Sequence, residues 1–128
     1  MKSGDTYRFA KPQPGFDVNR HLWIILSDPD IDPNEILAVY MTSLKAKMDQ
    51  TCILDIGDHP FITHKTTIAY NAAVVWTKDE LEQALADGDI VAQVRIDDSL
   101  LTRIRFLALA SPRLLFVHQK IATNQGFR

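Results

Sequence analysis

Hydrophobic residues follow two different periods along this chain, and the change between them falls near residue 77. Before it, apolar and polar positions alternate in short runs between turn residues, which is typical of β-strands. The run His21–Ser27 is almost continuously apolar, which predicts a strand buried on both faces. The predicted strands are Gly4–Lys11, His21–Ser27, Glu35–Ser43, Thr51–Ile56, Phe61–Tyr70 and Ala72–Trp76.

Turn-forming residues separate these strands. Lys11–Arg20 contains two prolines and a glycine, so we expect a loop, and its length exceeds that of an ordinary hairpin connection. Prolines also predict a loop at Asp28–Asn34, and the polar stretch Leu44–Gln50 predicts another. The sequence Gly57-Asp58-His59-Pro60 predicts a tight turn, because each of its residue types favours turns or ends regular structure.

Helical signals begin at Thr77, which forms a capping-box pattern with Glu80. The predicted helix runs to Asp87 and stops at Gly88. The alternating run Ile90–Ile96 then predicts a strand or an extended linker.

Two more helices are predicted after this run. Asp97 and Asp98 open one of them, because carboxylates favour the positive end of a helix. Ser111 and Pro112 predict the start of another helix, Arg113 to about Thr123. In the helix that opens at Asp97 and Asp98, the positions expected to face inward are Leu100, Ile104, Leu107 and Ala108. Strands followed by helices predict one α+β domain, with a small barrel or half-barrel over residues 1–76 covered by a helical extension, 77–128.

The composition argues against some classes of protein, but it does not indicate one function. The 128 residues are 46% hydrophobic and 23% charged, with a net charge of −2, which is typical of a globular domain. No apolar run reaches the roughly 18 residues of a membrane span, and the first residues lack the apolar stretch of a secretion signal. A single cysteine gives no internal disulfide, so we expect a cytoplasmic protein.

Potential catalytic or metal-ligating residues are densest in Thr51–Tyr70. Asp55, Asp58, His59 and His64 are all possible metal ligands, although their spacing matches no established metal motif, and such residues also favour turns. We therefore predict no metal and no other cofactor. Cys52 lies within an apolar strand, where a thiol is usually a small core residue.

RNA cleavage without a metal needs a base, an acid and a cation for the developing phosphorane. Candidates are Arg20 at the end of the long loop, Thr42 and Ser43 at the end of a strand, and the histidines His59 and His64. Each residue taken alone also has an ordinary explanation, as a solvated charge or a strand or turn residue. Candidate substrate-binding residues are Ser43, Lys45, Lys47 and Lys65.

The order of these motifs resembles the PemK/MazF-like toxins of type II toxin–antitoxin systems. The matching pieces are Gly4-Asp5 before a strand, Arg20 before the apolar run His21–Ser27, and the stretch Ala38–Ser43, which ends its strand with Thr42-Ser43. The GDHPFI motif further resembles an uncharacterised bacterial and prophage subgroup related to those toxins. His21 replaces the usual proline after the arginine, and residues 77–128 are longer than the usual C-terminal helix.

This resemblance implies a small SH3-like β-barrel of five to six mostly antiparallel strands with C-terminal helices packed on it, usually in a homodimer. It implies cleavage of single-stranded mRNA without a metal, to a 2′,3′-cyclic phosphate, and an antitoxin protein as partner. Arg20 would stabilise the phosphorane and donate a proton, and Thr42 would orient the reacting group, with His59 or His64 assisting. The alternative is a non-catalytic binding or accessory protein on the same barrel, whose groove binds a peptide or is filled by its own C-terminal helices.

Overall fold

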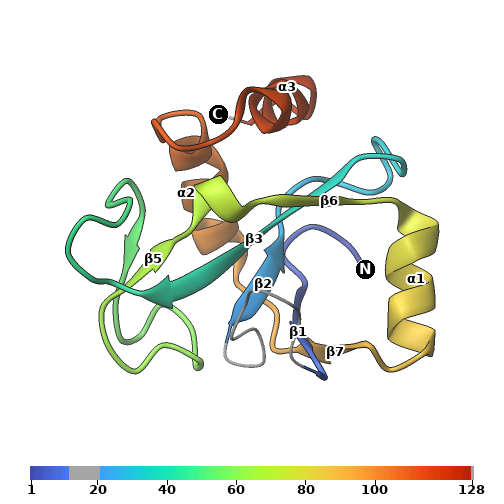
Figure 1. Cartoon of the computed structure of the whole chain (residues 1–128), viewed down its shortest axis with the longest axis horizontal. Helices are drawn as coiled ribbons and strands as arrows, with labels where there is room; N and C mark the ends of the chain where they lie inside the picture. The colour runs from blue at the N-terminus through green and yellow to red at the C-terminus, as the bar shows by residue number, and fades with distance from the viewer. Residues whose placement is uncertain (12–20, 128) are drawn as a thin grey trace.

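The computed structural model describes residues 1–11 and 21–127. In this part of the chain a seven-stranded antiparallel sheet is accompanied by three α-helices and a short 3-10 helix, so the prediction of an α+β fold is confirmed (Figure 1). The strands are β1 (Thr6–Phe9), β2 (Leu22–Ile25), β3 (Ile36–Ser43), β4 (Ile53–Leu54), β5 (Thr66–Ile68), β6 (Val74–Trp76) and β7 (Ile90–Gln93). The helices are η2 (Tyr70–Ala72), α1 (Lys78–Ala86), α2 (Asp98–Ala108) and α3 (Phe116–Asn124).

The long strand β3 organises the sheet. It pairs with β2 along one edge, and two short strands share its other edge, β5 opposite its C-terminal half and β6 opposite its N-terminal half. The helix η2 separates these two partners. The pairing order is β4-β5-β3-β2-β1-β7, and no pairing joins β4 to β7 within the described residues. The register places Ser43 opposite Thr66, which brings the polar end of β3 beside β5.

Both faces of the sheet are covered. One cluster joins alternate residues of β2 and β3 to α2 and α3, and the other joins the opposite face to β1, β7 and α1. The prediction that the apolar run after His21 is buried on both faces is confirmed, because all four residues of β2 are buried. Each such leucine or isoleucine contributes about 1.5–3 kcal/mol by leaving water.

Aromatic rings form a continuous chain through the second cluster. His21 stacks on Tyr40 with ring centroids 4.3 Å apart, and Tyr40 meets Trp23 at 5.0 Å. Trp23 stacks on Tyr7 at 6.0 Å, and Tyr7 meets Trp76 edge to face at 6.0 Å. Aromatic pairs with this geometry add to the burial of each ring. The chain of rings therefore makes this face of the sheet a rigid platform from β2 to β6.

The strands predicted over Thr51–Ile56 and Phe61–Tyr70 form a hairpin around the turn at residues 57–60, but they are shorter than predicted. In the first strand, side chains bind the backbone amides that a longer strand would pair. The carboxylate of Asp49 accepts from Thr51 N, and that of Asp58 accepts from Asp55 N, so only Ile53–Leu54 pairs as a strand. The alternation predicts Cys52, Leu54 and Ile56 on one face of a strand, but Ile56 lies beyond the paired residues and is 71% exposed, whereas Cys52 and Leu54 are buried. Residues 61–65 likewise form no strand, and only Thr66–Ile68 pairs as one.

Of the three helix starts that the sequence predicts, those of α1 and α2 are confirmed and that of α3 is wrong. Thr77 accepts from Glu80 N while Glu80 accepts from Thr77 N, so the capping box is confirmed. The predicted helix start at Asp97 and Asp98 is confirmed, and Asp97 caps α2 by accepting from Leu100 N. The third helix starts at Phe116 rather than at residue 113. In the described residues, no helix has both the length and the apolar character needed to cross a membrane.

The late start of α3 has a local cause. Ser111 Oγ donates to the Asp49 carboxylate at 2.5 Å and accepts from Arg113 N at 3.1 Å. The serine is therefore bonded to a distant loop in the way expected of a turn, and residues 112–114 form that turn before the helix. A cap pattern in the sequence does not fix a helix when another buried partner competes for the hydroxyl.

Candidate functional site

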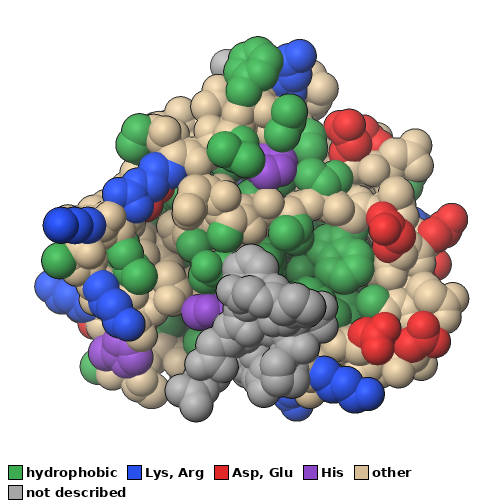
Figure 2. Space-filling view, in the orientation of Figure 1, with side chains coloured by type: hydrophobic (Ala, Val, Ile, Leu, Met, Phe, Trp, Pro, Cys, Tyr) green, Lys and Arg blue, Asp and Glu red, His purple; other side chains and the backbone are tan. Residues whose placement is uncertain are grey.

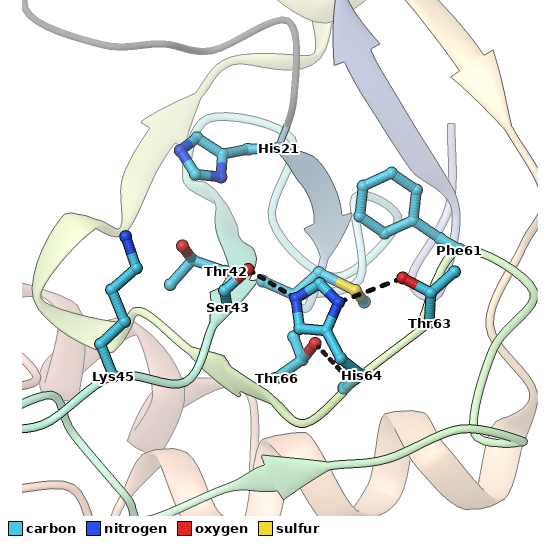
Figure 3. A pocket seen from close by; sticks show the side chains of 9 residues that line it. His21, Thr42, Ser43, Lys45, Phe61, Thr63, His64 and Thr66 are labelled. Carbon is cyan, nitrogen blue, oxygen red and sulfur yellow. Dashed lines mark hydrogen bonds between the residues drawn. The ribbon is translucent and has the colours of Figure 1, made fainter.

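A polar pocket of about 460 Å³ lies where the C-terminal end of β3 meets β5 (Figure 3). Its size is within the range of small-ligand sites. The side chains come from the residue before β2, from the end of β3 and the loop after it, and from the segment that leads into β5 with the first residue of that strand. The pocket is lined by His21, Met41, Thr42, Ser43, Lys45, Phe61, Thr63, His64 and Thr66.

His64 is the centre of a hydrogen-bonded array in this pocket. Its Nε2 lies 2.6 Å from Ser43 Oγ and its Nδ1 lies 3.1 Å from Thr63 Oγ1 (Figure 3). Hydroxyl groups can donate or accept, so either ring nitrogen can carry the proton while both contacts are kept. Histidine is also the side chain best suited to exchange a proton near neutral pH. This array can therefore move a proton between a bound molecule and the imidazole.

Backbone pairing places the array. Ser43 and Thr66 are opposite residues in the β3–β5 ladder, and Leu44 N donates to Lys65 O at 3.1 Å just beyond it. Thr66 Oγ1 donates to His64 O at 3.0 Å, which fixes the turn that carries the imidazole. The strand ends thus bring Ser43 and His64 together, although they are 21 residues apart.

A smaller cavity of about 210 Å³ is also lined by His21 and Thr42. Its other lining residues include Tyr40, Asp49, Asn71 and Arg113. Arg113 comes from the segment before α3, and its guanidinium Nη2 donates to Lys47 O at 2.7 Å. The C-terminal segment therefore supplies a cation to the side of the cavity near Thr42.

The carboxylate of Asp49 anchors this neighbourhood. It is buried and accepts from Thr51 N, Thr51 Oγ1 and Ser111 Oγ. Burial by itself raises the pKa of this carboxyl, but the hydrogen bonds from Ser111 and Thr51 and the charge of Arg113 outweigh burial, so its pKa lies below the usual value. Asp49 is therefore an ionised structural group beside the pocket.

Several predicted site residues gather here. Thr42, Ser43, Lys45 and His64 all line the pocket, as the hypothesis of a site at the strand ends requires. Lys47 and Lys65 are exposed in the adjoining loops and are not among the residues lining it. Arg20 lies outside the described residues, so its predicted role is not addressed by the geometry.

His59 is not brought to this pocket. Its ring is buried, Nε2 lies 2.7 Å from Val94 O, and Nδ1 accepts from Phe61 N at 3.0 Å. Because Nδ1 is an acceptor, Nε2 must carry the proton that it donates to the carbonyl. His59 joins the GDHP turn to the segment after β7, and this geometry favours a structural role over the predicted catalytic one.

The alternative of a metal site in the hairpin is also not supported. Within residues 1–11 and 21–127, no three His, Cys, Asp or Glu side chains come close enough together to hold a metal ion. Asp58 instead forms an ion pair with Arg103, with Nη2 and Oδ2 3.4 Å apart. Cys52 is fully buried and burial raises the pKa of its thiol, as expected of a core residue.

Sequence reasoning missed three contributors to the site. Thr63 and Thr66 support His64 on both sides, and their positions next to that histidine were the available signal. Arg113 had no such signal, because 66 residues separate it from the loop carbonyl that it contacts. Only the packing of the C-terminal segment brings it there.

Comparisons of this chain with protein-family models, with curated proteins and with solved structures found no match. The resemblance to the PemK/MazF-like toxins therefore stays a prediction, and the site has to be judged on its own chemistry.

Proposed function

We propose that this protein is a PemK/MazF-like endoribonuclease that cleaves single-stranded RNA in the pocket at the end of β3, without a metal ion. The observation that carries the proposal is the Ser43–His64–Thr63 array, which lies in one pocket with Thr42 and Lys45. A proton-transferring imidazole, hydroxyl groups and a cation are the parts that cleavage by the RNA 2′-hydroxyl requires. The antiparallel order around β3 is compatible with the SH3-like barrel that we propose by resemblance.

The proposed reaction is an internal transfer at phosphorus. The 2′-hydroxyl loses its proton and its oxygen attacks the adjacent phosphorus, the bond from phosphorus to the 5′-oxygen breaks, and that oxygen gains a proton. The products are a 2′,3′-cyclic phosphate and a 5′-hydroxyl. No oxidant, reductant or second substrate is needed.

Each residue of the pocket has a role in this proposal. His64 takes the 2′-hydroxyl proton, directly or through Ser43 Oγ. Lys45 offsets negative charge on the phosphorane oxygens, and Thr42 orients the phosphate. The resemblance assigns protonation of the leaving oxygen to Arg20, which lies outside the described residues.

The test is cleavage of a 5′-labelled single-stranded RNA of mixed sequence by purified protein in the presence of EDTA. We expect His64→Ala to slow cleavage about 10²–10⁴-fold, the usual contribution of a general acid–base group. Lys45→Ala should also slow it, whereas Lys78→Ala, an exposed lysine on α1, should leave it unchanged. Intact RNA with wild-type protein, or equal rates for wild type and His64→Ala, would contradict the proposal.

A non-catalytic binding module remains the second candidate, and one observation favours it. Ser111 and Arg113, from the segment between α2 and α3, contact the loop beside Thr42, so the C-terminal extension does reach the edge of the site. The same RNA in a gel-shift measurement separates the two. RNA that stays intact over hours, whether or not it is retained, contradicts the nuclease and supports the binding module, whereas cleaved RNA contradicts the binding module.

A further inference from the structure

A second hollow, of about 700 Å³, lies between β1, β6 and α1, away from the elements that build the polar pocket. We call it the acidic groove. Phe9 and Trp76 contribute aromatic rings to it, and α1 with the residues after it contributes carboxylates. Its acidic residues are Asp79, Glu80, Asp87 and Asp89.

The aromatic part of the groove is held rigidly. Trp76 Nε1 donates to Tyr7 Oη at 2.9 Å, and Tyr7 is fully buried at the centre of the aromatic chain. Phe9 lies against Trp76 with ring centroids 6.3 Å apart and planes inclined by 26°. Both rings are only partly buried, so each offers surface to the groove. A ligand would therefore meet a preformed aromatic surface and would not need to order it.

The charge of the groove runs against the usual preference of a helix. The C-terminal end of α1 is its negative end, which cations stabilise, yet its last turn has no basic residue and its C-cap is Asp87, followed by Asp89. Asp79, in the first turn of α1, follows the usual preference and adds a further carboxylate to the groove. Negative charge therefore accumulates at the C-terminal end of α1, where lysine or arginine is favoured, and a bound cation would offset this charge.

The surface view shows the same separation of charge. Figure 2 shows acidic side chains gathered on the side of the molecule that carries α1, next to exposed apolar surface, and several Lys and Arg side chains on the opposite side. A nucleic acid or an anionic membrane would be repelled from the acidic side. A positively charged group with a flat or apolar part would be attracted to it.

We propose that the acidic groove binds an arginine-containing basic segment of a partner protein. Guanidinium groups of the segment can stack on Trp76 or Phe9 while their N–H groups donate to the carboxylates at either end of the groove, Asp79 or Asp87. Arginine fits better than lysine because its planar group makes both contacts at once, whereas an ammonium group is more strongly hydrated. The groove shares no lining residue with the polar pocket, so this proposal does not rest on the nuclease.

The test measures binding of a fluorescein-labelled hexa-arginine peptide to the full chain by fluorescence anisotropy, with hexa-lysine and hexa-glutamate peptides for comparison. We expect hexa-arginine to bind most tightly and hexa-glutamate not to bind. The double variant D79N/D87N should weaken binding about tenfold, as expected when two charged contacts and their support of ring stacking are removed. Equal binding of hexa-arginine and hexa-lysine would contradict the proposed ring stacking.

The matched control is E35Q/E82Q, which changes the net charge by the same amount at exposed carboxylates outside the groove. Equal loss in both double variants would show unspecific attraction and would overturn the proposal. Two-dimensional ¹⁵N NMR of the unsubstituted protein gives a second readout that needs no folding of a variant. The indole N–H signal of Trp76 should shift on peptide binding while that of buried Trp23 stays still, and an unmoved Trp76 signal would also overturn it.

Discussion

The polar pocket and the acidic groove lie at two ends of one chain of aromatic rings, but different forces hold them in shape. His21 and Tyr40 are at the end near the pocket, and Phe9 and Trp76 form part of the groove. The groove rests on stacked, buried rings. The pocket is positioned by the pairing of β3 with β5, and the cavity beside it is held by hydrogen bonds that the carboxylate of Asp49 accepts from Thr51 and Ser111.

Because the stabilising interactions differ, the two regions should respond differently to pH and to substitution. Apolar packing is insensitive to pH and loses stability in proportion to the volume removed. A buried carboxylate network is sensitive to protonation, and it leaves several donors without partners when one group is lost. The two regions can therefore be tested by substitutions that act on only one of them.

The largest expected effect on stability is at the centre of the aromatic chain. Trp23→Ala should lower the free energy of unfolding by about 3–5 kcal/mol, because a large buried side chain leaves a cavity. Urea unfolding followed by circular dichroism measures this. Trp23→Phe is the matched control and should cost much less, because it keeps a ring and removes an indole N–H that is buried without a hydrogen-bond partner in the described residues. Equal losses for the two variants would contradict a role for ring packing.

A smaller loss is expected on the polar side. Asp49→Asn keeps the size of the side chain but removes its charge, so the donors from Thr51 and Ser111 lose a strong acceptor. We expect the free energy of unfolding at neutral pH to fall by about 1–3 kcal/mol. Asp30→Asn, at an exposed aspartate, should change it by less than about 0.5 kcal/mol. A loss no larger than that of the control would show that the network does not support the pocket.

The smallest expected effect is the pH dependence of the difference in unfolding free energy between wild type and Asp49→Asn. The pKa of Asp49 is lowered in the folded protein, so the unfolded chain binds the proton more readily, and the stabilisation is present above the unfolded pKa of about 3.9. It is lost as pH falls through the folded pKa. The gap in unfolding free energy between wild type and Asp49→Asn should therefore shrink below about pH 4. The gap between wild type and Trp23→Ala should stay constant, and a parallel fall of both would contradict the assignment.

The sequence was most informative where one signal acted alone. The apolar run after His21 had no competing interpretation, and β2 is buried as predicted. The capping box at Thr77 involves only residues within one helical turn, and it forms as written. At Ser111 the same kind of signal failed, because the hydroxyl found a buried carboxylate 62 residues away. Local patterns are reliable until a distant polar group competes for the same atoms.

The candidate site likewise contains residues that the sequence could identify and one residue whose surroundings it could not predict. The sequence identified Thr42, Ser43, Lys45 and His64 by residue type and by their position near strand ends, and the structure places all four in one pocket. It treated His59 as the equal of His64, since both occur in the same polar hairpin. Whether an imidazole faces a cavity or the backbone depends on which carbonyl packs against it, and Val94 O is 35 residues away.

The amino-acid sequence alone predicted which segments form strands and helices, the doubly buried strand β2, the capping box of α1 and the start of α2, because these depend on periodicity and on contacts within a few residues. Only the folded packing shows the short β4 and β5, the position of Arg113 in the cavity that Thr42 also lines, and the different surroundings of His59 and His64. It also placed Phe9 beside α1, forming a groove that the linear pattern did not suggest. The physical reason is that each of these features is a choice among polar or aromatic partners that are distant in the chain, and only the folded packing selects between them.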